Sequence, residues 1–298
     1  MKVNLKHLII ILTLIGSTSC DDKLEPFENN GSTGAPVAIS ASAIQSEALP
    51  GAINLTWSAQ PNDFAYMQVR YHDPLEKKDI CKIFSTGATQ LLVENTRARF
   101  GDYSFAFQTF NAANQSSAVT EVKAKSGAAP ASYTEKNRTK VPLTGLQVST
   151  DQADSSEGKV SNLIDDDKGS FFSSNWHNSG TTYPTYIQID FDEPHENFAV
   201  KYINRTDDTW RESGRPAVVD LQVSNDGDNW TTVGTLSGMP TQAGSEYASP
   251  YFMPGESFTH FRFSVVAASG SASYFCISEL MFYDVDIDIY DPETVPLD

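Results

Sequence analysis

The chain has 298 residues, of which 40% are hydrophobic and 11% aromatic, a composition that excludes a disordered chain and fits one large or two ordinary domains. Its formal net charge of -17 argues against nucleic acid as a partner, because polyanion binding needs clustered Lys and Arg; a neutral ligand or a cation is easier to hold. Three cysteines are too few for a disulfide scaffold, and we expect Cys81 and Cys276 to be small buried side chains.

Residues 1–19 have the pattern of a signal peptide. Two lysines precede the apolar run "LIIILTLI", which is too short to span a bilayer, and small residues then lead to Cys20. The segment resembles the lipobox of bacterial lipoproteins, in the looser form of Bacteroidota-like sequences. That resemblance implies a lipid on Cys20, and the following "DDKLE" resembles a signal for export to the outer surface. The protein is thus expected at the outer membrane, lipid-anchored and surface-exposed; plain secretion is the alternative.

Residues 20–35 are rich in Gly, Ser, Asn and acids and read as a flexible tether. Residues 36–125 alternate apolar and polar side chains in short runs separated by turn residues, as in "AINLTW", which predicts a β-sandwich. The run "PGAINLTW" with Trp57 resembles the second strand of a fibronectin type III domain. We expect His72 and Asp73 to be turn residues and not a catalytic dyad.

A second all-β domain is expected at residues 143–286. A polar, small-residue segment at 126–142 precedes it and reads as a linker, and an acidic tail at 287–298 follows it. Within the domain, "NDGDNW" predicts a tight turn in which Gly227 takes a positive φ.

The stretch "NLIDDDKGSFFSSNW", residues 162–176, sets three adjacent carboxylates beside three aromatic rings. Adjacent acids repel each other unless water or a cation relieves them. The stretch is therefore an acid/base pair, a metal loop or a solvated turn. We expect Phe172, Trp176 and Trp230 to be packing residues.

Six segments of the second domain, "NLIDDDKGSFFSSNW", "PTYIQIDF", "YINR", "VSNDGDNW", "FRFSV" and "SELMFY", resemble in order and spacing the discoidin, or coagulation factor 5/8 C-terminal, domain. That family includes many galactose-type carbohydrate-binding modules. The resemblance implies a jelly roll of eight strands with ligand loops at one end. The expected fold class is all-β, a fibronectin type III-like sandwich followed by a discoidin-like jelly-roll barrel.

The resemblance also implies a structural Ca²⁺, which takes carboxylate, hydroxyl and carbonyl oxygens. Asp166 stands where many family members have Gly, and we expect its side chain to point to solvent. Carried over by position, the ligands are Leu163, Asp165, Asp167 and Ser170 of the acidic loop with Ser278 and Glu279 near the end of the domain.

Sugar sites combine an aromatic face with a few fixed polar groups. Arg205 matches a family arginine that bonds the sugar, and its alternative role is an ion pair with a nearby acid. Ser173 and Ser213 replace family histidine and asparagine positions, which departs from the pattern for galactose. The candidate ligand-binding residues implied by the resemblance are Arg205, Trp210, Arg215, Asn175, His177 and Tyr274.

The predicted function is a non-catalytic surface lipoprotein that binds glycan through its discoidin-like domain, accessory to polysaccharide capture. A neutral glycan suits the net charge better than a polyanionic one. One alternative is an adhesin or a structural subunit of a surface protein complex, since fold does not fix function. Another is a glycoside hydrolase, which needs two carboxylates across a cleft; neither domain leaves room for a further catalytic fold.

Overall fold

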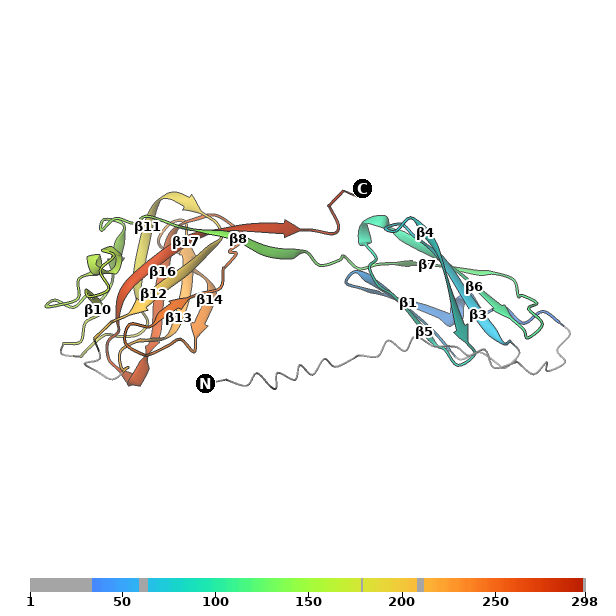
Figure 1. Ribbon diagram of the computed structural model, residues 1–298, viewed down its shortest axis with the longest axis horizontal. Coiled ribbons are helices and arrows are strands. Elements are labelled where there is room, and N and C mark those ends of the chain that lie inside the picture. Colours follow the sequence, from blue (N-terminus) through green and yellow to red (C-terminus); the bar gives the residue numbers. More distant parts are fainter. Residues whose placement is uncertain (1–33, 59–63, 178, 208–211, 297–298) are drawn as a thin grey trace, which may run out of the picture. The chain divides into compact units, whose positions relative to one another are not determined.

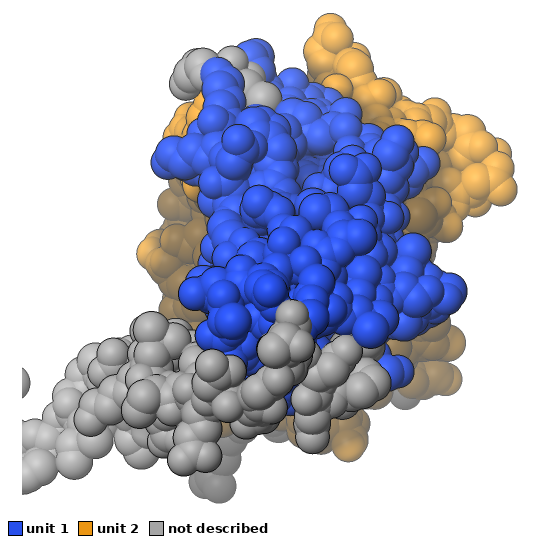
Figure 2. All heavy atoms as spheres, turned by 90° about the vertical axis from the view of Figure 1, so that its right-hand side faces the viewer, with its two compact units in different colours: residues 1–131, 291–298 blue, residues 132–290 orange. Residues whose placement is uncertain are grey.

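The computed structural model describes residues 34–58, 64–177, 179–207 and 212–296. In these residues the secondary structure is β-strand with short 3-10 helices, which confirms the predicted all-β class. No helix among them is long and apolar enough to cross a membrane. The chain forms two compact units, residues 1–131 with 291–298 and residues 132–290 (Figures 1 and 2).

The first unit is a sandwich of two antiparallel sheets, as the alternating pattern predicted. Its three-stranded sheet has the order β1 (Ile44–Leu49), β2 (Ala52–Trp57), β5 (Gln90–Val93). Its four-stranded sheet has the order β4 (Lys78–Ser85), β3 (Tyr66–Asp73), β6 (Asp102–Phe110), β7 (Thr120–Lys125).

Alternate residues of these strands form the core of the first unit. Ile53 and Leu55 of β2 are fully buried, and so is Val69 of β3. The indole N–H of Trp57 donates to the carbonyl of Ala88 at 2.7 Å, so the buried ring keeps its polar group bonded. The sandwich is thereby established, while the likeness to fibronectin type III stays a prediction.

The structure contradicts the expectation that Cys81 is buried. Cys276 is buried as predicted, but Cys81 is exposed. Cys81 lies on β4, which is an edge strand of the four-stranded sheet, and it faces away from the core while Phe84 packs against it. The sequence did not reveal this, because "KDICKIFS" places apolar residues on both faces of the strand.

The C-terminal segment completes the first unit. The Glu293 carboxylate accepts the backbone N–H groups of Ala98, Arg99 and Ala129 at 3.1, 2.8 and 2.6 Å. These hydrogen bonds lower the pKa of Glu293 against the opposing effect of desolvation. Residues 287–298, expected to be an acidic tail, therefore include a segment packed on the sandwich.

The second unit has two facing sheets, the arrangement expected of a jelly roll. One has the order β14 (Thr231–Ser237), β13 (Pro216–Ser224), β16 (Phe258–Ala268), β11 (Thr185–His195), β9 (Val148–Thr150). The other has the order β10 (Phe172–Ser173), β17 (Cys276–Tyr290), β12 (Phe198–Asn204), β15 (Glu246–Ala248), with β8 (Ser132–Lys140) also paired to β17.

Aromatic side chains fill the space between these two sheets. Phe172 is fully buried, as predicted, and its ring lies 5.5 Å from that of Phe275. Phe198, Phe261 and Phe282 form a second buried group, with ring centroids 5.2–5.3 Å apart. Burial of such rings dominates the stability of a domain of this kind.

The strand β8 lies within residues 126–142, where a linker was expected. It pairs with the second half of β17, from Tyr283 opposite Lys140 to Tyr290 opposite Ser132. The segment reads as a linker because most of β8 is exposed and its sequence, "SYTEKNRTK", is polar on both faces. Its backbone hydrogen bonds, which the side-chain pattern does not reveal, define it as a strand.

Candidate functional site

Three connections between strands of the second unit come together at one end of its sheets. The backbone N–H of Thr181 donates to the carbonyl of Ser273 at 2.6 Å, and that of Cys276 donates to the carbonyl of Gly214 at 2.8 Å. We call the described residues of these connections, 174–177, 179–184, 205–207, 212–215 and 269–275, the rim. It gathers the loops that the resemblance marked as ligand loops.

Gly214 explains the close packing of two of these loops. It has a φ of +69°, and a Cβ at this position would meet Cε2 of Tyr274 at 2.4 Å. Only glycine satisfies both demands. The Tyr274 ring therefore packs directly on the backbone that leads into Arg215.

Arg205 lies in the rim, where its guanidinium makes two contacts within the protein. Its guanidinium lies 3.5 Å over the Phe171 ring and pairs with the Asp207 carboxylate at 2.6 Å. Desolvation lowers the pKa of Arg205, but the hydrogen bond that Arg205 donates to the Asp207 carboxylate, with the charge of that carboxylate, outweighs this and raises it. The structure thus contains the ion pair that sequence reasoning held as the alternative role of Arg205.

Arg215 is a buried residue of the rim that bonds another rim loop. It is only 2% exposed, and its side chain donates to the carbonyl of Asp207 at 3.2 Å. Burial lowers the pKa of Arg215, and the neighbouring Arg205 charge lowers it further. The structure therefore brings Arg205, Arg215 and Tyr274 together, with Arg215 withdrawn from the surface.

Asn175 and His177 lie in the loop after β10, where both make hydrogen bonds within the protein. The Asn175 side-chain oxygen accepts the backbone N–H of His177 at 3.0 Å, and Nδ1 of His177 lies 2.7 Å from the Asp154 carboxylate. The Asp154 side chain is fully buried. These contacts orient His177 and leave its side chain 37% exposed.

Trp176 is the rim residue that sequence reasoning misassigned. It was expected to pack inside, but it is 45% exposed and stacks on the His177 ring with centroids 3.9 Å apart. Its loop position beside a histidine was the available signal. By contrast Trp230 does pack, with its indole N–H bonded to Gly227 and the Arg262 guanidinium 3.9 Å over its ring.

Two predicted residues cannot be placed. Trp210 and Cys20 lie outside the described residues. Of the candidate ligand-binding residues, the structure therefore places all but Trp210 in the rim.

The acidic stretch forms a tight loop after the 3-10 helix η3 (Val160–Ile164), which buries Leu163 completely. The Asp165 carboxylate accepts the backbone N–H of Asp167 at 2.9 Å and the hydroxyl of Ser170 at 2.8 Å. Asp166 has a φ of +58°, a conformation that glycine adopts more easily, and its carboxylate pairs with Lys140 at 2.8 Å. The Asp167 carboxylate accepts the backbone N–H of Gly169 at 2.9 Å, so each acid of the loop has its own partner.

The strand β17 brings Glu279 to this loop. Glu279 is 2% exposed, and its Oε1 is buried without a hydrogen-bond partner among the described residues. Burial, together with the neighbouring charges of Asp165 and Asp166, raises the pKa of Glu279 to about 7. A buried carboxylate with a free oxygen beside Asp165 is the arrangement that a bound cation would relieve.

The other expected calcium ligands lie around the same loop. The Ser278 hydroxyl donates to the carbonyl of Lys168 at 3.1 Å, and the backbone N–H of Ser170 donates to the carbonyl of Asp167 at 3.0 Å. In the described part of the chain no three His, Cys, Asp or Glu side chains gather as a metal cluster. The expected site needs only two such carboxylates, because its remaining ligands are neutral oxygens.

Comparison with known families agrees with this architecture. Residues 146–280 match the model of the F5/8 type C domain, in agreement with the sequence resemblance. No curated protein matches the chain.

Several solved structures are similar at low identity. CpGH89CBM32-5 from Clostridium perfringens, in complex with GalNAc-β-1,3-galactose, is 16% identical with a TM-score of 0.39, covering 46% of this chain and 93% of its own. The C-terminal domain of a chitobiase from Bacteroides fragilis is 20% identical with a TM-score of 0.39, covering 51% and 100%. A SusE-like protein is 13% identical with a TM-score of 0.37, covering 85% and 99%.

Proposed function

We propose that this chain is a non-catalytic glycan-binding protein that holds a neutral sugar at the rim of its F5/8 type C domain. The observation that carries the proposal is the exposed Trp176 ring, fixed by His177 and Asp154 at the rim. An exposed indole offers an apolar face to sugar C–H groups, and Arg205 and Tyr274 supply polar groups for hydroxyls. Arg215 holds these loops in place.

The ion pair of Arg205 with Asp207 favours a neutral ligand over an anionic one. The Asp207 carboxylate already occupies one of the guanidinium N–H groups of Arg205. A sugar hydroxyl can bond the remaining groups of such a pair without breaking it, whereas a carboxylate ligand would compete with Asp207. The net charge of -17 also favours a neutral ligand over an anionic one.

We propose further that calcium binds the acidic loop, with Asp165 and Glu279 as its carboxylate ligands. The carbonyl of Leu163 and oxygens of Asp167, Ser170 and Ser278 complete the set of six. The buried free oxygen of Glu279 and its raised pKa support this assignment. The ion links the loop to β17 and has no role in bond breaking.

The localisation belongs to the same proposal. A lipid on Cys20 would hold the protein at the outer membrane, with residues 20–35 as the tether, so that it assists polysaccharide capture at the cell surface. This rests on the sequence pattern of residues 1–20.

A glycan array probed with the chain beginning at residue 21, followed by calorimetry on the best neutral glycan, tests the rim. We expect Trp176→Ala to weaken binding by about tenfold or more, since aromatic anchors dominate small sites. Tyr133→Ala is the matched control, because Tyr133 is also an exposed aromatic, at 47%, and lies on β8 outside the rim. No bound glycan on the array with a folded protein contradicts the proposal and favours the adhesin alternative.

A further inference from the structure

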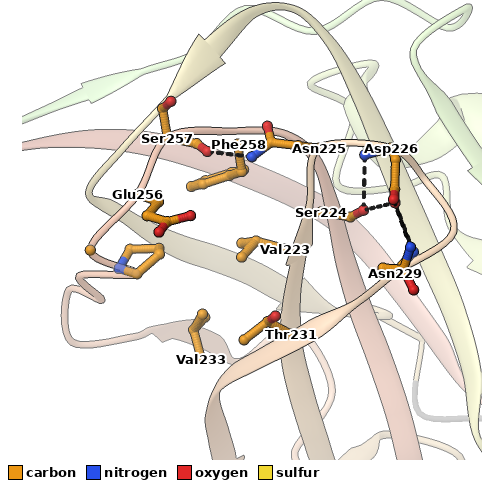
Figure 3. Close-up of a pocket in the computed structure, with 12 residues that line it drawn as sticks. Val223, Ser224, Asn225, Asp226, Asn229, Thr231, Val233, Glu256, Ser257 and Phe258 are labelled. Carbon is orange, nitrogen blue, oxygen red and sulfur yellow. Dashed lines mark hydrogen bonds between the residues drawn. The ribbon is translucent and has the colours of Figure 1, made fainter.

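A pocket of about 580 Å³ opens in the second unit at the opposite end of β13 from the rim (Figure 3). The strand β13 begins at Pro216, next to Arg215 of the rim, and ends at Ser224, which lines the pocket. The β13–β14 turn and residues 254–258 form the walls. Its volume lies within the roughly 300–1,000 Å³ of small-molecule sites.

The floor of this pocket is apolar. Val223 and Phe258 belong to the core and are buried, and Val233 and Pro254 continue the surface. Figure 3 shows the Glu256 carboxylate pointing across the hollow toward Val223. The pocket therefore combines an apolar base with a charged acceptor at its edge.

The turn that forms one wall is held by Asp226. Its carboxylate accepts the backbone N–H groups of Asp228 and Asn229 at 2.9 and 2.7 Å, and the Asn229 amide at 2.7 Å. Gly227 takes the positive φ predicted from the sequence, at +75°. The Asp226 carboxylate thus accepts its hydrogen bonds from within the turn, and Asp226 is a structural residue.

Other polar groups of the lining remain available. The Glu256 carboxylate, the Thr231 hydroxyl and the Asn229 side-chain oxygen have no hydrogen-bond partner within the part of the chain that the structure describes. All three can accept a hydrogen bond, and Thr231 can also donate one. All three belong to residues that line the pocket.

This chemistry selects one class of ligand. An anion would meet Glu256 and Asp226, and a metal ion would find one free carboxylate in a space far larger than its coordination shell. We propose that this pocket is a second glycan-binding site, which takes one sugar unit of a neutral glycan. Its C–H face lies on Val223, Val233 and Pro254, and its hydroxyls donate to Glu256, Thr231 and Asn229.

The pocket is independent of the rim, and separate variants address each. Thr231→Trp fills the pocket from an exposed position, and Glu256→Gln removes the charged acceptor. Asp228→Asn is the matched control, because it removes the same charge from an exposed residue of the turn that does not line the pocket. Trp176→Ala weakens binding only at the rim.

The experiment follows backbone amide chemical shifts of Asn225, Asn229 and Glu256 in the chain from residue 21. The probes are glucose, N-acetylglucosamine, methyl β-galactoside and xylose, with glucuronate as an anionic and spermidine as a cationic probe. We expect saturable shifts with at least one neutral sugar, unchanged in Asp228→Asn and Trp176→Ala. Glu256→Gln should weaken binding by about tenfold, and Thr231→Trp should abolish it.

Three outcomes overturn the proposal. The first is that no neutral sugar moves these amides. The second is that the shifts persist in Thr231→Trp, which would place the sugar elsewhere. The third is that spermidine alone moves them, which would make the pocket a cation site.

Discussion

At the scale of single residues, Asp154 determines how the rim is presented. Its buried carboxylate accepts the backbone N–H of Ser156 at 2.8 Å and that of Trp176 at 3.3 Å, and it pairs with His177 at 2.7 Å. One acid therefore orders both rings of the exposed stack. Desolvation opposes its ionisation, but the hydrogen bonds with Ser156, His177 and Glu157 prevail and lower the pKa of Asp154 below its usual range.

We expect Asp154→Asn to destabilise the second unit by about 2 kcal/mol at pH 7, because a charged acceptor of several hydrogen bonds is lost. The folded-state pKa lies below the unfolded value of about 3.9, so this stabilisation is complete above that pH. It is lost as the pH falls through the folded-state pKa. Urea unfolding at pH 7 and at about pH 3 measures the difference between variant and wild type at each pH.

The difference should shrink at the lower pH, and the Trp176 fluorescence should change in the variant even when it is folded. Glu157→Gln provides the control, since Glu157 is an exposed carboxylate whose backbone alone bonds Asp154. An equal loss of stability at both pH values would show that the charge of Asp154 is not what holds the loop.

Residue roles in the rim were only partly predictable. The sequence placed Arg205, Arg215 and Tyr274 in ligand loops, and the structure brings them together. It did not show that Arg215 is buried and Trp176 exposed. Exposure in a loop depends on which other loops cover it, and here Ser273 and Gly214 meet residues distant in sequence.

At the scale of elements, side-chain alternation predicted the strands with one buried face. The strand β2 buries every second residue, and β11 does so for its first seven. The strand β8 was not predicted, because both of its faces are polar and its pairing with β17 depends on backbone groups. The acidic loop and Glu279 lie far apart in sequence, and only the family resemblance linked them.

Calcium should stabilise the second unit through the link between η3 and β17. At a concentration about 100 times its dissociation constant, a ligand specific for the folded state adds about 2.7 kcal/mol. We therefore expect a higher unfolding temperature in calcium than in chelator, measured by calorimetry. Glu279→Gln should lose this calcium effect.

The same variant should be at least as stable as wild type in chelator, because it removes repulsion between Glu279 and the two acids near it. Asp166→Asn is the control, since Asp166 pairs with Lys140 and is not an expected ligand; its calcium effect should remain. If calcium does not change the unfolding temperature of the wild-type protein, the proposed calcium site is wrong.

At the scale of the whole molecule, binding sites and attachment are separate features of the chain. The rim and the pocket both belong to the second unit, whereas the proposed lipid attachment at Cys20 lies in the sequence ahead of β1, the first strand of the first unit. Contact with a single sugar is weak, and many anchored copies raise the effective concentration of sites. The lipid should therefore change retention of a cell on glycan and leave the affinity of one molecule unchanged.

Cys20→Ser tests this separation in a bacterium that lipidates its exported proteins. We expect wild type to incorporate labelled fatty acid and to fractionate with the outer membrane, and the variant to do neither. Cys81→Ser is the control, since Cys81 is exposed but lies within the folded first unit, and it should keep the label.

The purified Cys20→Ser protein should bind its glycan with wild-type affinity, because the rim is unaltered, while cells that carry it lose adhesion to a glycan-coated surface. Label retained in Cys20→Ser would contradict the assignment of the anchor, and lost affinity of the purified variant would show that the N-terminal segment around residue 20 contributes to the site.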